Sequence, residues 1–230
     1  MPRYIILIPA YNAENSIGNL LDEINTLEIK PSQVIVVDDG SSDKTAMIAE
    51  KKDAVLIRLP KNQGKGFALK RGFECAKHLS EIEFILCMDA DLQHPVFSIP
   101  NFINTANKLN SDFILGNRNK SFKSMPLHRI ISNKLTSRII SILTGQIIKD
   151  SQCGMRLIRK DILKNIQLSE NGFQLESEII FRIAEQKCRI DHVDIPTIYN
   201  SEMSNIGNIS DTFKFIKLMF KEMIRKIYAF

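Results

Sequence analysis

Two aspartates separated by one residue, Asp89 and Asp91, come directly after an apolar run that begins at Phe84. The run predicts a buried strand, which would carry both carboxylates to its own C-terminal end. Ligands bind at that end in an open parallel α/β sheet, and paired carboxylates there suit a hard divalent cation such as Mg²⁺. A cation held in this way would neutralise a substrate diphosphate, whose oxygens complete its coordination. The alternative is an ordinary turn with two solvated aspartates.

The first half of the chain alternates apolar strands with helices. We expect strands at residues 4–8, 34–37, 55–59 and from 84 onward, and helices at about 17–24, 43–52 and 67–78. Fully apolar strands in such an alternation predict a parallel sheet that helices cover on both faces. Three of the four strands end in polar, turn-forming residues, which should gather at one edge of the sheet. The predicted fold class is α/β.

The second half of the chain does not keep this regular alternation of strands and helices. We expect helices at 95–110, 127–143, 159–166 and 175–186, short strands at 113–116, after 156 and at 190–195, and a loop at 117–120. The last segment, 209–230, places apolar residues on one side and lysines and an arginine on another, which predicts a basic amphipathic helix. We therefore expect one domain over 1–208, with the helix 209–230 appended to it.

The composition limits the class of function. The 31 Lys and Arg residues exceed the 26 Asp and Glu residues by five, a balance that suits an anionic substrate or membrane surface but is too weak to indicate nucleic acid. No run of 18 apolar residues occurs and no charged-then-apolar leader precedes Tyr4, so we expect neither a membrane span nor a secretion signal. The four scattered cysteines fit no zinc spacing, which favours reduced thiols in a cytoplasmic protein.

Four short motifs follow one another along the chain: Pro-Ala-Tyr-Asn at 9–12, Val-Val-Asp-Asp-Gly-Ser-Ser-Asp at 36–43, Asn-Gln-Gly-Lys-Gly at 62–66 and Asp-Ala-Asp-Leu-Gln at 89–93. Together they resemble the family-two glycosyltransferases of the GT-A fold, and the last is most similar to the dolichol- or polyprenyl-phosphate sugar synthase branch. The resemblance implies a Rossmann-like, mostly parallel sheet. It also implies an enzyme that uses Mg²⁺ or Mn²⁺ to transfer a sugar from a nucleotide-diphosphate sugar with inversion. The nucleotide-binding patterns of P-loop ATPases and dehydrogenases are absent from the sequence.

On the donor side, the resemblance implies contacts between these motifs and the nucleotide sugar. The Tyr11 ring would line the nucleobase pocket, with a plain strand-to-helix turn as the alternative. Asp39 would accept a hydrogen bond from the nucleobase or the ribose, as an acidic residue does in dinucleotide folds. Lys65 lies between two glycines, which would leave room for a phosphate. The implied donor-binding residues are Pro9, Tyr11, Glu14, Asp38, Asp39, Lys65, Asp89 and Ala90, with Glu14 one position later than the acid of the polyprenyl branch.

The resemblance also implies the metal ligands, which are Asp89 and Asp91 with Gln93 as a neighbouring oxygen donor. Acting as a Lewis acid, the metal would hold the charge that develops on the diphosphate as the sugar leaves.

On the acceptor side, Arg118 and Arg129 match arginines that bind the acceptor phosphate in the polyprenyl branch. A planar guanidinium suits this task because it can bond two phosphate oxygens, although Arg129 has the alternative of a solvated helix residue. Ser132 lies nearby in the sequence, and Ser204 belongs to a segment where the branch carries a basic residue that this chain lacks. The amphipathic helix 209–230 offers another route to a lipid acceptor, since such a helix can lie on an anionic bilayer.

We expect two catalytic carboxylates. Asp91 would act by binding the metal, and a second carboxylate would act as the general base. Asp150 is the first candidate for the base, and Glu178 or Glu176 is the second, with a helix-surface charge as the alternative for each. A phosphate monoester is already largely anionic near neutral pH and needs little deprotonation, whereas a sugar hydroxyl needs a true base.

The sequence is compatible with three functions. The leading one is sugar transfer from a UDP- or GDP-linked donor to a polyprenyl phosphate, dolichyl or undecaprenyl, by a peripheral protein at the cytoplasmic membrane face. The second is transfer to a hydroxyl of a polysaccharide, lipid or protein glycan, and the third is a non-catalytic module that binds nucleotide sugars or membranes. The chain's partners would be the donor, the acceptor, the membrane surface, and a second copy of the chain or a membrane protein.

Overall fold

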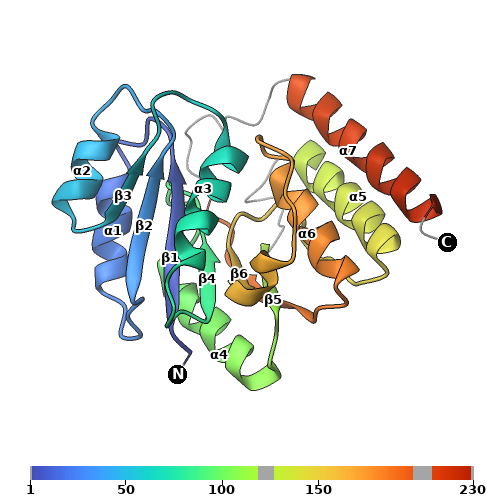
Figure 1. Ribbon diagram of the computed structural model, residues 1–230, viewed down its shortest axis with the longest axis horizontal. Helices are drawn as coiled ribbons and strands as arrows, with labels where there is room; N and C mark the ends of the chain where they lie inside the picture. Colours follow the sequence, from blue (N-terminus) through green and yellow to red (C-terminus); the bar gives the residue numbers. More distant parts are fainter. Residues whose placement is uncertain (1, 119–126, 199–208, 229–230) are drawn as a thin grey trace.

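The computed structural model describes residues 2–118, 127–198 and 209–228, and these residues contain a seven-stranded sheet (Figure 1). The strands are β1 (Tyr4–Ala10), β2 (Gln33–Asp38), β3 (Val55–Arg58), β4 (Phe84–Cys87), β5 (Phe113–Arg118), β6 (Arg156–Arg159) and β7 (Ile190–Ile195). Their order across the sheet is β3-β2-β1-β4-β6-β5-β7. β6 runs antiparallel to both of its neighbours, and every other pairing is parallel.

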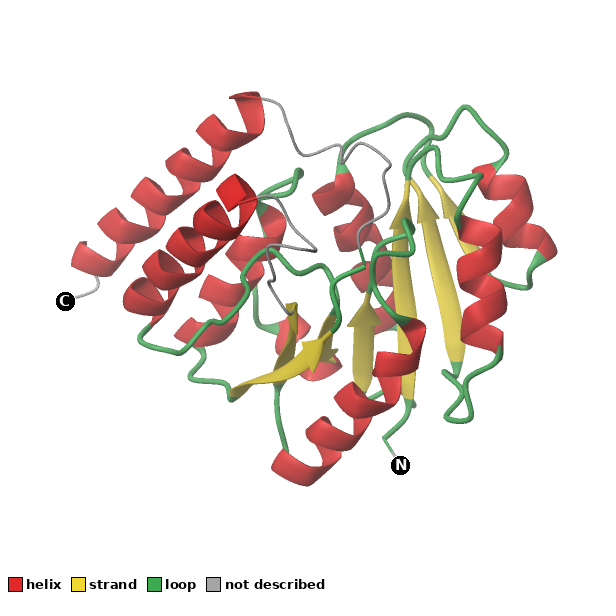
Figure 2. Ribbon diagram, turned by 180° about the vertical axis from the view of Figure 1, so that it is seen from behind, coloured by secondary structure: helices red, strands yellow, loops and turns green. Residues whose placement is uncertain are grey.

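Helices cover both faces of this sheet (Figure 2). They are α1 (Ile17–Asn25), α2 (Thr45–Lys51), α3 (Lys65–Lys77), α4 (Ile99–Leu109), α5 (Leu127–Thr144), α6 (Leu175–Glu185) and α7 (Ile209–Tyr228). Successive side chains of a strand point to opposite faces. Ile6 and Ile8 of β1 accordingly join the core beneath α1, α2 and α4, whereas Ile5 and Leu7 join the core beneath α3, α5 and α6. This two-layered burial explains why β1 and β4 are buried at every position.

The expected α/β architecture is confirmed, and most predicted elements lie within a few residues of their observed bounds. The predicted loop at 117–120 is wrong in its first two residues, because β7 runs alongside β5 and extends that strand through Arg118. The helix expected at 95–110 divides into a 3-10 turn at Val96–Ser98 and α4. The helix expected at 159–166 is a 3-10 turn at Lys160–Lys164.

The basic amphipathic helix expected at the end of the chain is present as α7, which lies beside α5 and α6 (Figures 1 and 2). Leu218 and Glu222 point inward and are buried, and Glu222 forms an ion pair with Arg182 of α6. Arg225 reaches Glu185 of α6 at 3.6 Å. In the described part of the chain, no helix combines the length and apolar character needed to cross a bilayer.

Candidate active site

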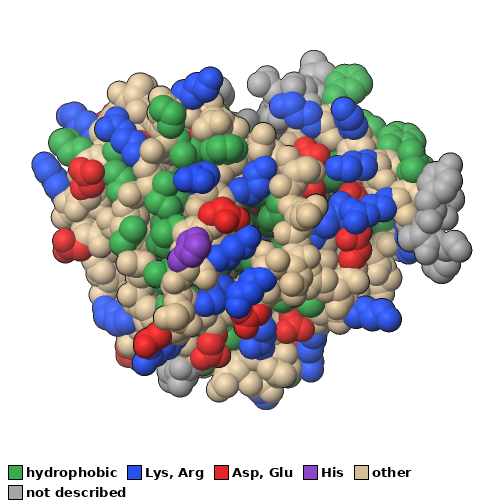
Figure 3. All heavy atoms as spheres, viewed as in Figure 1, with side chains coloured by type: hydrophobic (Ala, Val, Ile, Leu, Met, Phe, Trp, Pro, Cys, Tyr) green, Lys and Arg blue, Asp and Glu red, His purple; other side chains and the backbone are tan. Residues whose placement is uncertain are grey.

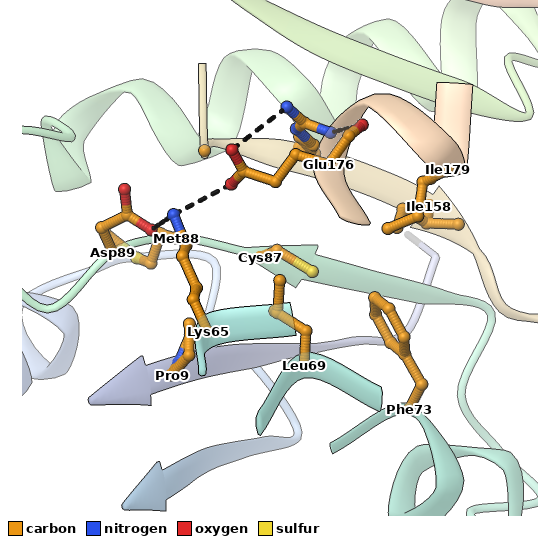
Figure 4. Close-up of a pocket in the computed structure, with 12 residues that line it drawn as sticks. Pro9, Lys65, Leu69, Phe73, Cys87, Met88, Asp89, Ile158, Glu176 and Ile179 are labelled. Atoms are coloured by element: carbon orange, nitrogen blue, oxygen red, sulfur yellow. Dashed lines mark hydrogen bonds and ion pairs between the residues drawn. The ribbon is translucent and has the colours of Figure 1, made fainter. Parts of the chain in front are cut away.

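The polar ends of several strands meet at one edge of the sheet. β1, β2 and β4 run parallel, so the turns after all three lie at the same edge, together with the start of α3. β6 begins there as well, because it runs in the opposite direction. A small cavity of about 10 Å³, the room of roughly one water molecule, lies at this edge. Figure 4 shows side chains that line it.

Lys65, the first residue of α3, is held between two acidic side chains beside this cavity (Figure 4). Its ammonium lies 2.5 Å from Asp89 Oδ1 and 2.9 Å from Glu176 Oε1. Burial by itself would lower the pKa of Lys65, but the two carboxylates outweigh burial and raise it. Lys65 therefore remains a cation at the sheet edge where the sequence predicts an anionic ligand.

Arg156, at the start of β6, extends this network of ion pairs into the protein interior. Its guanidinium is 2% exposed and donates to the carbonyls of Cys153 at 2.7 Å and Ser151 at 2.9 Å. One of its nitrogens also lies 3.7 Å from Glu176 Oε2. Arg156 thus fixes Glu176, and Glu176 in turn fixes Lys65. The sequence did not single out Arg156, since its apolar neighbours in β6 gave no sign that a guanidinium would point to the site.

The turn after β4 presents Asp89 and Asp91 on a constrained backbone. The N–H of Asp89 donates to Nδ1 of the buried His94 at 3.0 Å, the N–H of Gln93 donates to Asp91 Oδ1 at 3.0 Å, and Leu92 adopts a left-handed φ of 61°. Such a φ is uncommon for a non-glycine residue and is often found at functional sites. Because its Nδ1 accepts, His94 is neutral in this arrangement, and burial lowers its pKa.

The electrostatics of the two aspartates suit a bound cation. Burial works to raise the pKa of Asp89, yet the charge of Lys65 brings it down to about 2. Burial, and then the charge of Asp89, raise the pKa of Asp91. A divalent cation between these carboxylates would relieve that repulsion, and carboxylate oxygens are ligands that Mg²⁺ and Mn²⁺ accept. The described residues hold no cluster of three or more His, Cys, Asp or Glu side chains that could bind a metal, so oxygens from other sources would have to complete the coordination.

The predicted nucleobase side is formed by two loops that hydrogen bonds join together. The N–H groups of Asn12 and Ala13 donate to Ser41 Oγ at 2.9 Å and to Thr45 Oγ1 at 2.7 Å. Glu14 is exposed, and its carboxylate accepts the N–H of Lys44 at 3.1 Å. Pro9 lines the cavity and Tyr11 is 45% exposed, so its ring remains accessible to a ligand. Ala90 is buried in the turn after β4.

Asp38 and Asp39 at the end of β2 make different contacts. Asp38 is fully buried, accepts the N–H of Ser41 at 3.0 Å and lies 3.5 Å from Arg58 Nε. Asp39 accepts the N–H groups of Gln63 and Gly64 at 2.9 and 2.8 Å, and burial raises its pKa. Asp39 thus holds the loop that leads into α3.

The two glycines around Lys65 have a packing role that the sequence did not indicate. A Cβ on Gly64 would lie 2.6 Å from the carbonyl oxygen of Asn171, and one on Gly66 would lie 2.6 Å from that of Gly172. The loop before α6 therefore passes against the start of α3, and this close approach requires glycine at both positions.

Arg118 and Asp150 form a buried pair at the C-terminal end of β5. The Nε and Nη2 atoms of Arg118 donate to Asp150 at 2.8 and 3.0 Å, and Asn133 of α5 adds a third hydrogen bond at 2.7 Å. Asp150 is 0% exposed. The structure therefore brings together Arg118, which the sequence assigned to the acceptor phosphate, and Asp150, its first candidate base, and it adds Asn133, which the sequence did not indicate.

The remaining predicted residues lie in several surroundings. Glu178 accepts from Ser169 N, Ser169 Oγ and Glu170 N at 2.6–3.0 Å, so its carboxylate holds the loop before α6 and is not among the residues that line the cavity. Ser132 is exposed on α5. The side chain of Arg129 and the whole of Ser204 lie outside the described residues, and the roles proposed for both stay predictions.

Comparison with known proteins identifies relatives over most of the chain. An N-acetylglucosaminyltransferase of Methanococcus voltae, which acts between UDP-N-acetylglucosamine and dolichyl phosphate, is 29% identical over 95% of this chain and 95% of its own. A dolichyl-phosphate hexose transferase of Haloferax volcanii is 31% identical over 83% of this chain and 81% of its own. A dolichol-phosphate mannosyltransferase of Pyrococcus furiosus is 32% identical over 77% of this chain and 52% of its own.

Among solved structures, glucosyl-3-phosphoglycerate synthase of Mycobacterium tuberculosis superposes with a TM-score of 0.75 over 98% of this chain and 80% of that one, at 15% identity. This similarity shows a shared GT-A fold. The family model described as "Glycosyl transferase family 2" matches residues 5–167, which include the turns at the ligand edge and the Arg118–Asp150 pair. The chain therefore belongs to glycosyl transferase family 2.

Proposed function

We propose that this protein transfers a sugar from a UDP- or GDP-linked donor to a polyprenyl phosphate, dolichyl or undecaprenyl. One observation carries the proposal: all three candidate bases are already engaged, Asp150 and Glu178 by several hydrogen bonds and Glu176 by its ion pair with Lys65, while a guanidinium lies at the same sheet edge. Asp150 accepts from Arg118 and Asn133, and Glu178 accepts from the loop at 169–170. A hydroxyl acceptor would need a base that is ready to take its proton, whereas an anionic phosphate does not.

In this proposal the donor lies across the turns after β1, β2 and β4. Asp89 and Asp91, with Gln93, would hold Mg²⁺ or Mn²⁺, which would supply Lewis-acid stabilisation of the diphosphate leaving group. Related structures support a divalent ion, since the mycobacterial synthase has been crystallised with Mg²⁺ and UDP. Lys65 contributes a permanent positive charge beside Asp89, and Glu176 keeps it in place.

On the acceptor side, Arg118 would bind the phosphate. Asp150 holds the Arg118 guanidinium by two hydrogen bonds, so the arginine is positioned before the acceptor arrives. Such preorganisation lowers the barrier because no side chain has to be ordered during the reaction. The names of the relatives support this acceptor class, since three of them use dolichol or dolichyl phosphate.

A transfer assay tests the proposal. The purified chain is incubated with UDP- and GDP-linked radiolabelled sugars, Mn²⁺ or Mg²⁺, and either a short-chain polyprenyl phosphate or a panel of glycan hydroxyl acceptors. We expect label in the lipid fraction for at least one donor, and loss of that label in Asp89→Asn with Asp91→Asn. Preferential labelling of a hydroxyl acceptor would overturn the acceptor assignment, and unchanged turnover in the double variant would overturn the metal assignment.

A further inference from the structure

The exposed large apolar side chains concentrate on two neighbouring helices. α5 and the residues directly after it expose Leu127, Ile131, Leu135, Ile142 and Ile147, and α7 exposes Phe213, Ile216, Phe220, Met223 and Ile224, each at 40–76%. We call these ten residues the α5–α7 apolar face. Soluble proteins rarely expose apolar side chains in such groups, and where they do, the surface commonly binds a partner or a membrane.

Packing within the protein does not account for this face, since both helices bury the opposite side. α7 turns Leu218 and Glu222 inward, while Phe213, Phe220 and Ile224 recur at helical spacing on its outer side. α5 turns Asn133 and Ile140 inward. Each helix therefore has one side that packs on the domain and a second, apolar side that is exposed.

The charges beside the face are of one sign. Among the side chains that the structure describes on α5 and α7, the exposed charged ones are Lys134, Arg138, Lys214, Lys217, Lys221 and Arg225. The one acid described there, Glu222, is buried and paired with Arg182. Figure 3 shows apolar side chains along α7, at the upper right, with lysine and arginine side chains next to them.

We propose that the α5–α7 apolar face lies on an anionic lipid bilayer. An apolar strip flanked by lysines and arginines is the pattern of a helix that lies in the plane of a membrane interface. Each basic residue near an anionic surface adds attraction, whereas a second copy of the chain docked on this face would bring like charges together. The bilayer therefore satisfies both the apolar and the basic side chains.

This inference rests on the proposed function in one respect, because it explains how a lipid-borne phosphate reaches the site. Asn133, on the inner side of α5, donates a hydrogen bond to Asp150, and Asp150 also accepts a hydrogen bond from Arg118. The helix that contacts the bilayer on its outer side thus supports the proposed phosphate-binding pair on its inner side.

Vesicle flotation of the full chain tests the inference, without donor or acceptor present. The vesicles are phosphatidylcholine alone, or phosphatidylcholine with 30% phosphatidylglycerol by design. We expect binding to the anionic vesicles that weakens as salt is added. Lys217→Gln with Lys221→Gln should lower the partition coefficient about 25-fold, which is about fivefold for each charge. Phe220→Gln with Ile224→Gln on α7, and Ile131→Gln with Leu135→Gln on α5, should each lower it by about tenfold or more.

The matched control is Phe97→Gln. Phe97 is an apolar residue that is 70% exposed, and it lies in the 3-10 turn at Val96–Ser98, outside α5 and α7. This variant should bind vesicles as the wild type does. Equal binding by all the variants would overturn the inference, and so would a concentration-dependent dimer that the α5 and α7 substitutions abolish.

The transfer assay with a short-chain acceptor in detergent separates this inference from the proposed function. Transfer without vesicle binding would refute the bilayer contact alone. Vesicle binding without transfer to any polyprenyl phosphate would refute the proposed acceptor while leaving the bilayer contact standing.

Discussion

Gly154→Ala should weaken the predicted metal site without replacing any of the predicted ligands. Gly154 lies in the turn before β6, and a Cβ there would be 2.7 and 2.9 Å from the two carboxylate oxygens of Asp89 and 2.8 Å from Cε1 of His94. Ordinary van der Waals contact begins at 3.4 Å, so the nearer oxygen would have to move away by about 0.7 Å. The Asp89 carboxylate has little freedom to do so, because Lys65 holds its other side at 2.5 Å.

The displacement is large compared with what a metal site tolerates, since ligand distances have to hold within about 0.2 Å. We therefore expect the affinity for Mn²⁺ in the presence of UDP to fall about 10- to 100-fold, the range typical when a group that orients a ligand is changed. The free energy of unfolding should fall by about 1–3 kcal/mol, as for other overpacked interiors. Isothermal titration calorimetry measures the first quantity and urea unfolding the second.

Gly72→Ala provides the matched control. A Cβ at Gly72 would collide with the side chain of Leu7, in the core beneath α3. This variant should also lose stability through overpacking, but it should keep the affinity for Mn²⁺ and UDP. If Gly154→Ala binds Mn²⁺ and UDP as tightly as the wild type, then Asp89 does not bind the metal from its observed position.

Two further predictions concern groups around the site, and a third concerns His192 of β7. Asp150→Asn leaves the Arg118 guanidinium without its negative partner, so the free energy of unfolding in urea should fall by about 3 kcal/mol and sugar transfer to the polyprenyl phosphate should be lost; a stability equal to that of the wild type would contradict the pairing. Glu178→Gln removes an anionic acceptor from the loop at 169–170, so we expect a stability loss of about 2 kcal/mol with kcat changed less than tenfold, whereas a loss of kcat at normal stability would identify Glu178 as a base. Burial, and then the charge of Lys149, lower the pKa of His192 from 6.5 to about 4, so stability that is full above pH 6.5 should decline as the pH falls toward 4. Urea midpoints across that range should decline less in His192→Gln, and an unchanged pH profile would show that His192 is not responsible.

The fold could be predicted from the sequence because the strands of its first half are nearly continuous apolar runs. That pattern requires burial on both faces, and the alternation with helices then fixes a mostly parallel sheet. The same logic placed Asp89, Asp39 and the start of α3 at one edge of the sheet, as the pairing of β1, β2 and β4 confirms. These inferences needed only local patterns and a general rule of sheet topology.

The contacts within the site could not be predicted in the same way, since they depend on the direction of β6. A short apolar strand does not indicate whether it will pair parallel or antiparallel, and the antiparallel pairing with β4 is what brings Arg156 and Gly154 to the ligand edge. The loop at 171–172 likewise reaches Gly64 only through the tertiary fold. Long-range packing of this kind leaves no periodic signal in the sequence.

The proposed function depends on Asp89 and Asp91 binding a divalent cation together with the donor diphosphate. Titration of Mn²⁺ followed by electron paramagnetic resonance, in the presence of UDP, measures this binding. We predict one Mn²⁺ per chain in the wild type, and at least about a 100-fold loss of affinity in Asp89→Asn and in Asp91→Asn, because each substitution removes a charged ligand. Affinity for Mn²⁺ and UDP that is unchanged in both variants would contradict this role of Asp89 and Asp91.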